Sequence, residues 1–417
     1  MKKILAMLLA LAMVFSLAAC GNTSNTPGDP ATPSSEPGTP SSDAPSTPAP
    51  GSDAPEAPKY EDMGTIMWLS NLSSGPQYDC TVNYLTALCD ALGYDFTVVY
   101  GDPFNDAAGN LTAVTNGMTD DVVGIITSQD GGLAAIMEEF PELWVAGYNT
   151  DMRSVYSEGG ENAACLQNSK FLGTIADGYG NGFFLGQLLA QQTIDAGHKK
   201  VAIINFPVFA YPNLTEADAG FRTAIDEYNK TASEPIEIVG ETTTLMFEPL
   251  PDQWFLEEGH NDLDAIIGLC AGVLFIYPTM VGAIAAGTCS ADTKLITSGF
   301  ETDPDIIADI GENGRISSLL VSCAENPAYG LILIDNAITG NVAAGTNNAC
   351  IDSAPYLIDS AEDINNVMTK TLMGTGNVAD AHLSVEEIVA LCGRTNPNLT
   401  WEEIVAVFHS ISVEELK

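Results

Sequence analysis

Cys20 is the residue whose chemistry can be inferred most directly from its neighbours. It ends the sequence Leu17-Ala-Ala-Cys20, which follows Lys2, Lys3 and an apolar run over residues 4–17. Basic residues, an apolar run and a small-residue cleavage site in this order are typical of a secretory signal, and a cysteine at the end is typical of a lipidation signal. We therefore expect cleavage before Cys20 and attachment of a lipid to its thiol.

The apolar run before Cys20 could instead form a buried hydrophobic helix. A helix that spans a bilayer needs about 20 apolar residues, which is more than this run supplies. The order of the flanking signals favours an exported, lipid-anchored chain over a buried helix. We expect the protein on the extracytoplasmic face of a cell membrane, as on a Gram-positive cell surface.

A linker is predicted directly after Cys20. The segment Gly21–Pro58 contains ten prolines and no apolar side chain larger than alanine. Such a segment cannot bury enough apolar surface to offset the entropy of ordering it. Fully extended, it would reach on the order of 100 Å, which is enough to hold a folded domain away from a membrane.

The remaining reactive residue types form no recognisable catalytic or metal-binding pattern. The four histidines stand apart from the cysteines, no CxxC pair occurs, and no GxSxG or P-loop motif is present. The glycine-rich segment 178–182 lacks the lysine of a P-loop and the spacing of a dinucleotide site. We predict a protein that is not an enzyme and that needs no cofactor or metal.

The cysteines beyond Cys20 leave two alternatives open. A disulfide is compatible with an extracellular location, whereas small neighbouring residues favour buried free thiols at Cys270, Cys289 and Cys323. We assign no pairing. The eight residues are Cys80, Cys89, Cys165, Cys270, Cys289, Cys323, Cys350 and Cys392.

The charge of the chain excludes some classes of partner. Its 55 acidic residues outnumber 14 basic ones, giving a formal net charge of −41. Such a surface repels nucleic acid and anionic lipid. Solubility in an extracellular or salty medium explains the charge better than a specific acidic function.

The elements that must position any site alternate between short apolar runs and amphipathic stretches from Met63 onward. This alternation is typical of βαβ units and predicts parallel sheets. The length beyond residue 58 is too great for one core and favours two lobes. The predicted strands are Thr65–Leu69, Phe96–Val99, Val122–Ile126 and Trp144–Ala146 in a first series, and Val201–Ile204, Ile236–Val239, Ala265–Gly268, Leu295–Thr297 and Ser318–Val321 in a second.

Several of these segments, taken in order, resemble the type I periplasmic binding proteins of the ribose-binding and LacI-like group. No single motif is specific, but the resemblance extends over about residues 63–360. The segments that carry it are Thr65-Ile-Met-Trp-Leu-Ser-Asn-Leu, Leu92-Gly-Tyr-Asp-Phe-Thr-Val-Val, Gly173-Thr-Ile-Ala-Asp-Gly-Tyr with Gly186, Gly197-His-Lys-Lys-Val-Ala-Ile-Ile, Ala219-Gly-Phe-Arg-Thr-Ala-Ile, Leu263-Asp-Ala-Ile-Ile and Ile296-Thr-Ser-Gly-Phe-Glu.

The resemblance implies an α/β fold of two Rossmann-like lobes with parallel sheets, joined by three hinge crossovers. The crossovers are expected near residues 198–200, 323–326 and 353–357. The resemblance implies a first lobe over 63–198 and 324–353 and a second lobe over 199–323 and 354–376. The residues themselves predict a signal over 1–19, a lipidated cysteine and linker over 20–58, and a helical tail over 377–417.

Ligands of open α/β sheets bind beyond the carboxyl ends of the strands, so residues that follow the predicted strands are the candidates. The resemblance adds Asp177, Glu301 and Glu325 as polar contacts. The predicted ligand-binding residues are Ser70, Asn71, Tyr78, Ser128, Gln129, Asn149, Asp177, Tyr211, Phe247, Cys270, Glu301 and Glu325.

Some of these candidates have structural alternatives. Asp177 could cap the helix that follows it, and Tyr78 and Tyr211 could close the edge of a core rather than stack on a ligand. The arginine that the family places shortly before Gly220 is missing here. Cys270-Ala-Gly-Val273 replaces an expected Asn-Asp pair, which favours a less hydroxylated or more aromatic ligand than an ordinary sugar.

The tail contains a small repeat, Leu383-Ser-Val-Glu-Glu-Ile-Val and Leu399-Thr-Trp-Glu-Glu-Ile-Val. Each copy has the spacing of a capping box and predicts a short helix. The two helices are expected to pack on a lobe or to present a surface to a partner.

The resemblance implies a monomeric solute-binding protein that carries a small sugar-like, polar or aromatic solute to the permease of an ABC importer. Two alternatives remain open. One is a sensor that presents the liganded lobes to a membrane receptor or kinase, and the other is a binder of nucleosides or aromatic solutes.

Overall fold

The computed structural model describes residues 62–102, 105–148, 152–176, 182–207, 213–299 and 303–416. The predicted signal, Cys20 and the linker lie outside the described residues. Within the described ranges, no helix has both the length and the apolar character needed to cross a membrane.

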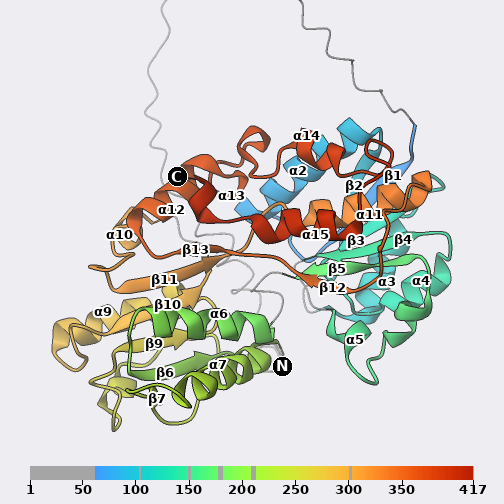
Figure 1. Cartoon of the computed structure of the whole chain (residues 1–417). Helices are drawn as coiled ribbons and strands as arrows, with labels where there is room; N and C mark the ends of the chain where they lie inside the picture. The colour runs from blue at the N-terminus through green and yellow to red at the C-terminus, as the bar shows by residue number, and fades with distance from the viewer. Residues whose placement is uncertain are drawn as a thin grey trace, which may run out of the picture. The chain divides into compact units, whose positions relative to one another are not determined.

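The first lobe is built on a six-stranded sheet in the order β12-β5-β4-β3-β1-β2 (Figure 1). All of its neighbouring strands run parallel. Every residue of β1 is buried, as expected for a strand that is covered on both faces. The strands are β1 (Thr65–Ser70), β2 (Asp95–Tyr100), β3 (Val122–Thr127), β4 (Trp144–Tyr148), β5 (Phe171–Ala176) and β12 (Cys350–Asp352).

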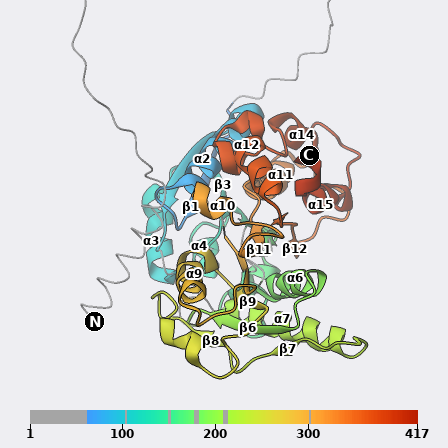
Figure 2. The ribbon, with the colours of Figure 1, turned by 90° about the vertical axis from the view of Figure 1, so that its left-hand side faces the viewer.

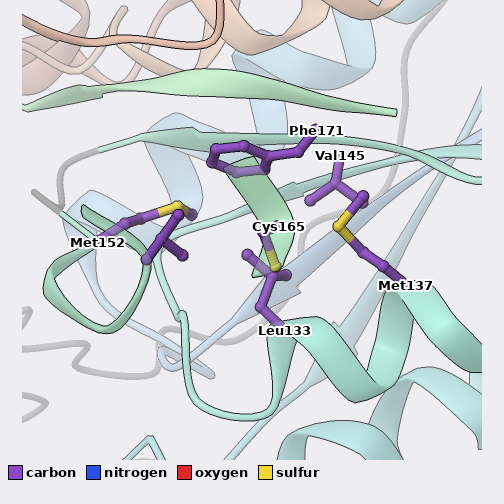
Figure 3. Packing of buried hydrophobic residues seen from close by; sticks show 7 residues of the cluster. Leu133, Met137, Val145, Met152, Cys165 and Phe171 are labelled. Atoms are coloured by element: carbon purple, nitrogen blue, oxygen red, sulfur yellow. The ribbon is translucent and has the colours of Figure 1, made fainter. Parts of the chain in front are cut away.

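Helices cover this sheet, and their apolar side chains form its core. One cluster brings Leu133 and Met137 of α4 onto Val145, Met152 and Phe171 (Figure 3). On α11, the run 327–336 is buried throughout, which makes it the central helix of the first lobe. The helical segments of this part of the chain are α2 (Pro76–Leu92), α3 (Ala107–Gly117), α4 (Leu133–Glu139), α5 (Arg153–Tyr156), η1 (Ala163–Gln167) and α11 (Pro327–Thr339).

The second lobe is built on a seven-stranded sheet in the order β13-β11-β10-β9-β6-β7, with β8 also paired to β6. Its strands run parallel except β13, which is antiparallel to β11. The strands are β6 (Lys200–Asn205), β7 (Glu237–Ile238), β8 (Thr243–Thr244), β9 (Ala265–Gly268), β10 (Lys294–Ser298), β11 (Ile316–Val321) and β13 (Tyr356–Ile358). The helical segments are α6 (Gly182–Asp195), α7 (Asn213–Asn229), η2 (Asp252–Leu256), α8 (Gly272–Phe275), α9 (Tyr277–Ala286) and α10 (Pro304–Ile307).

Helices α6 and α7 pack backbone against backbone, and glycine makes this possible. A Cβ atom at Gly186 would lie 2.0 Å from the carbonyl oxygen of Ala217, and one at Gly220 would lie 2.1 Å from that of Phe183. Helix α6 also contacts β10, so it lies with the second sheet. The boundary predicted at residue 198 placed this helix in the first lobe. The sequence of α6 fits either lobe, and only its packing on α7 shows that it belongs to the second.

The chain connects the two sheets at three places. It passes from β5 to α6 through residues 177–181, which lie outside the described part. It passes from β11 to α11, and then from β12 to β13, at the positions where the second and third crossovers were predicted.

Much of the C-terminal segment folds back onto the first lobe, while α12 and η4 contact β13 of the second sheet. Helix α14 contacts α2 and α11, and α13 also contacts α2 (Figure 1; Figure 2). Both predicted capping boxes are confirmed, at Ser384 with Glu387 and at Thr400 with Glu403. The elements are α12 (Ala361–Lys370), α13 (Leu372–Thr375), η3 (Val378–Asp380), α14 (Val385–Ala390), α15 (Trp401–Ser410) and η4 (Val413–Leu416).

A buried ion pair joins this segment to the central helix of the first lobe. The guanidinium of Arg394 lies 2.6 Å from a carboxylate oxygen of Asp335, and their side chains are 5% and 0% exposed. The hydroxyl of Tyr94 donates to the same carboxylate at 2.9 Å, and Arg394 donates to the carbonyl oxygen of Leu92. This part of the tail therefore belongs to the first lobe, whereas η4 at its end contacts α12 and β13.

Candidate ligand-binding site

Four aromatic side chains gather at the carboxyl edge of the first sheet. The rings of Trp68 and Tyr78 stack with centroids 5.5 Å apart, and the Trp68 indole donates to the Tyr148 hydroxyl at 2.8 Å. The hydroxyls of Tyr78 and Tyr100 are 2.8 Å apart, and Tyr100 is 53% exposed. The cluster thus runs from the buried core to solvent. We call these four residues the tyrosine edge.

The phenols of Tyr78 and Tyr148 are protonated at neutral pH. The hydrogen bond with Tyr100 raises the pKa of Tyr78 to about 12, and burial raises the pKa of Tyr148. Protonated phenols both donate and accept hydrogen bonds, and their rings offer apolar faces. This edge can therefore meet either a hydroxyl or a flat apolar ring.

The predicted polar residues of the first lobe near this edge fall into two groups, one at the surface and one buried. Asn71 is exposed, and its side-chain oxygen accepts from the Ser128 hydroxyl at 3.4 Å. Ser70 is buried and donates to the carbonyl oxygen of Leu72, so it fixes its own turn. Gln129 is buried and donates to the carbonyl oxygen of Asp102. Asn71 and Ser128 stay predicted ligand contacts, while the observed bonds of Ser70 and Gln129 hold loops.

Asp130 ties together the loops that carry this edge. One carboxylate oxygen accepts from the amide of Asn105 at 2.7 Å, and the other accepts from the Ser154 hydroxyl at 2.6 Å. Its carbonyl oxygen accepts from Asn162 at 2.7 Å. These bonds join the segments after β2, β3 and β4. Asp130 therefore fixes the positions of these three loops relative to one another.

The described side chains that follow β6, β8 and β9 at the carboxyl edge of the second sheet are mainly aromatic or aliphatic. Phe206 follows β6 directly and stacks on Phe247 with centroids 5.7 Å apart, while Phe275 meets Phe206 edge-on at 5.0 Å. Met246 and Leu274 beside them are 59% and 43% exposed. We call these five residues the phenylalanine edge. Phe247 was predicted as a contact, and Met246 and Leu274 lie in the segments after strands that the sequence indicated, whereas Phe206 and Phe275 lie outside them.

Two residues at this edge have left-handed backbone conformations that are unusual for their types. Phe247 has φ +62° and Ala271 has φ +48°. Such strain persists where surrounding packing holds it and is concentrated at ligand sites. Cys270, a predicted contact, is buried next to Ala271.

Glu325 occupies a different environment from the one predicted. It is buried, and its carboxylate accepts from the thiol of Cys323 at 2.8 Å and from the backbone amide of His382 at 2.8 Å. The resemblance placed a ligand contact here, and that role stays a prediction. The observed partners instead join the connection before α11 to the C-terminal segment.

One ion pair connects the two lobes near these edges. Arg153, at the start of α5, lies 2.6 Å from Glu216 in the first turn of α7, and both side chains are partly exposed. Nothing in the local sequence of either residue predicts this pair, because the partners are far apart along the chain.

The remaining predictions concern metal ions, disulfides and residues that the structure does not describe. Within the described ranges, no group of three or more histidine, cysteine or acidic residues could hold a metal ion. The eight cysteines from Cys80 to Cys392 carry thiols rather than disulfides, and all but Cys350 are buried. The predicted contacts outside the described residues are Asn149, Asp177, Tyr211 and Glu301.

No protein-family model and no curated protein matches this sequence. Solved structures do match. A solute-binding protein of an ABC transporter from Burkholderia graminis, in complex with D-arabinose, is 18% identical with a TM-score of 0.51, and the match covers 74% of this chain and 97% of that one.

A 5-methylthioribose transporter solute-binding protein from Thermotoga lettingae, in complex with 5-methylthioribose, is 15% identical with a TM-score of 0.51. That match covers 81% of this chain and 98% of the other. A carbohydrate transporter solute-binding protein from Agrobacterium radiobacter, in complex with D-arabinose, is 14% identical with a TM-score of 0.50 over 72% of this chain and 95% of the other. The chain has the two-lobed α/β fold of the type I periplasmic binding proteins, as its sequence motifs predicted.

Proposed function

We propose that this protein is an extracytoplasmic solute-binding lipoprotein, which captures a small solute between its two lobes and delivers it to an ABC permease. The observation that carries the proposal is the pair of aromatic edges at the carboxyl ends of two parallel sheets. Ligands of open α/β sheets bind at this end of the strands.

The solved structures named above support a sugar-like solute, since they hold D-arabinose or 5-methylthioribose. The tyrosine edge supplies uncharged hydroxyl partners for such a ligand, together with Asn71 and Ser128. The chain acts as a binding protein, without a catalytic step or a cofactor.

Closure around the ligand follows from general energetics. A ligand shifts a conformational equilibrium only by the difference in its affinity for the two states, so a solute must contact both edges to favour the closed one. The permease then receives a closed, liganded monomer. The lipid on Cys20 and the linker keep that monomer near the membrane, and the negative charge of the chain disfavours nucleic acid as a partner.

A thermal-shift screen tests the binding function. The chain from residue 21 onward, which lacks the proposed lipid, is heated with sugars, nucleosides, amino acids and aromatic acids. A ligand at a thousand times its Kd stabilises the folded state by about 4 kcal/mol, so the true class raises the melting temperature clearly. No shift with any class would contradict solute binding and would favour recognition of a protein partner.

Anchoring and delivery need their own measurements. In cells, Cys20→Ala should abolish incorporation of a labelled fatty acid into the protein and release it from the membrane. Uptake of the identified ligand should fall when the gene is deleted. Normal uptake alongside a lost transcriptional or motile response to the ligand would replace the importer by a sensor.

A further inference from the structure

We infer that the ligand of this site has two faces: a hydroxylated part that meets the tyrosine edge, and an apolar or aromatic substituent that meets the phenylalanine edge. Glycosides with an aryl or alkylthio group fit this description, and so do nucleosides. The inference rests on the proposed function and names the chemical class of its solute.

The first step is the polarity of the tyrosine edge. The paired hydroxyls of Tyr78 and Tyr100, the exposed Asn71 and the hydroxyl of Ser128 are all uncharged hydrogen-bonding groups. They can donate to or accept from the hydroxyls of a sugar ring. Their arrangement suits a neutral, hydroxylated surface better than an ionised one.

The second step is the apolar character of the described side chains on the other side. Among the described residues 206–207, 245–247, 270–275 and 299, which follow β6, β8, β9 and β10, no side chain is charged and the exposed ones are apolar; the exposed Glu248 comes next after Phe247. A sugar hydroxyl turned toward this edge would leave water without gaining a hydrogen bond, which weakens binding. An apolar substituent there is buried favourably. The described residues in question are Phe206, Pro207, Leu245, Met246, Phe247, Cys270, Ala271, Gly272, Val273, Leu274, Phe275 and Gly299.

The third step is the exposure and backbone conformation of Phe247. Its ring is only half-buried, it stacks on Phe206, and its backbone is held at φ +62°. Aromatic rings prefer offset-stacked or edge-on neighbours, and a partly open ring in such a cluster can accept one more. The left-handed backbone of a bulky residue indicates that the loop is selected for this placement rather than for its local conformational stability.

Matched ligand pairs test the inference by isothermal titration calorimetry of the chain from residue 21 onward. The pairs are methyl and phenyl β-D-glucopyranoside, and D-ribose and adenosine. We expect the substituted member of at least one pair to bind at least about tenfold more tightly than its partner. Equal or weaker binding of both substituted members, with measurable binding of a plain sugar, would overturn the inference and leave the proposed function intact.

Two substitutions test whether Phe247 is responsible for the preference for the substituted ligand. Phe247→Ala should reduce the preference for the substituted member by about five- to tenfold, and Phe247→Leu should reduce it less, because leucine keeps apolar area without a ring. Leu256→Ala is the matched control, since Leu256 is an apolar side chain that is 70% exposed on η2. An unchanged preference in Phe247→Ala, with the melting temperature of the free protein unchanged, would overturn the assignment of the phenylalanine edge.

A third substitution separates the two faces. Tyr100→Phe removes one hydroxyl of the tyrosine edge and should weaken both members of a pair by the same factor, so their ratio is unchanged. Loss of binding to only the substituted member would contradict the two-faced arrangement. Failure of all four compounds and of the wider screen would overturn the proposed function and this inference together.

Discussion

The two lobes share a sheet topology but are held together by different interactions. The first lobe relies on buried polar groups: Asp130 joins three loops through hydrogen bonds, and Asp335 pairs with Arg394. The second lobe relies on close contact between backbones, where Gly186 and Gly220 let α6 meet α7. A buried polar network is destabilised when one partner is removed. Close packing of two helices is destabilised when a side-chain atom is added between them. The two lobes should therefore fail under opposite kinds of substitution.

The largest effect is expected where the first lobe loses one partner of its buried pair. Asp335→Ala leaves the Arg394 guanidinium buried without its carboxylate, and unfolding should become about 3–5 kcal/mol easier. The free energy of unfolding in urea measures this. Asp218→Ala is the control, because the Asp218–Arg222 pair is partly exposed and such pairs contribute about 1 kcal/mol or less.

A double substitution tests more directly what the Asp335–Arg394 pair contributes to stability. Burial raises the pKa of Asp335 even beside a guanidinium, which indicates a large desolvation cost. Replacing both partners by apolar residues, as in Asp335→Leu with Arg394→Met, should recover much of the stability lost in the single variant. A double variant as unstable as Asp335→Ala would show that the pair itself, and not an unpaired charge, determines the stability.

The next effect concerns the second lobe. Gly186→Ala places a methyl group where the carbonyl oxygen of Ala217 lies 2.0 Å away, so α6 and α7 must separate. Overpacking of this kind costs about 1–3 kcal/mol. Gly282→Ala in α9 is the matched control, because nothing lies within 4 Å of its Cβ position, and it should be neutral or stabilising by up to about 1 kcal/mol. Equal melting temperatures for the two variants would refute close packing of α6 on α7.

A smaller effect is expected where the lobes touch. Glu216→Gln removes the partner of Arg153 in the pair that joins α5 to α7. If this contact belongs to the closed state, ligand affinity falls a few-fold at low ionic strength and the difference disappears in about 1 M salt, where charges are screened within about 3 Å. Titrations of the identified ligand at both salt concentrations measure this. Asp218→Asn, two residues further along α7 and paired within the helix, should leave the affinity unchanged.

The smallest effect lies in the C-terminal segment. Hydrogen bonds from the Ser384 hydroxyl and amide lower the pKa of Glu387 below its usual 4.5. A lowered pKa in the folded state means that the cap stabilises the fold above pH 4.5 and loses this contribution as the pH falls through the lowered value. Glu387→Ala should therefore unfold more easily than the parent at pH 7, and this difference should shrink as the pH falls below 4.5 and through the lowered pKa. A difference that stays the same over this pH range would contradict the role of the ionised carboxylate.

Much of the fold was predictable because its signals are local. All nine predicted strands are present, and both capping boxes form. Four strands were missed: β5, β8, β12 and β13. β8, β12 and β13 are only two or three residues long, and β5 contains Gly173 at φ +104°, which interrupts the apolar pattern of that strand.

The candidate site was predictable only in outline. The carboxyl-end rule led to Asn71, Tyr78 and Ser128, which lie together at one edge, and to Phe247 at the other. It could not find Tyr100 or Tyr148, since their roles depend on Tyr78 and Trp68 reaching them from other elements. Glu325 stays a predicted contact, but its partners Cys323 and His382 could not be predicted, because no neighbouring residue in the sequence reveals them.

The sequence by itself determined the order of the elements, the parallel character of the sheets and the helical tail, because apolar periodicity and capping depend on residues a few positions apart. Only the tertiary structure decided which lobe holds α6, that the tail is pinned by Arg394 to Asp335, and that one edge is phenolic while the other is apolar. Those outcomes depend on contacts between residues far apart along the chain. Packing and buried hydrogen bonds select such contacts, and no local pattern encodes them.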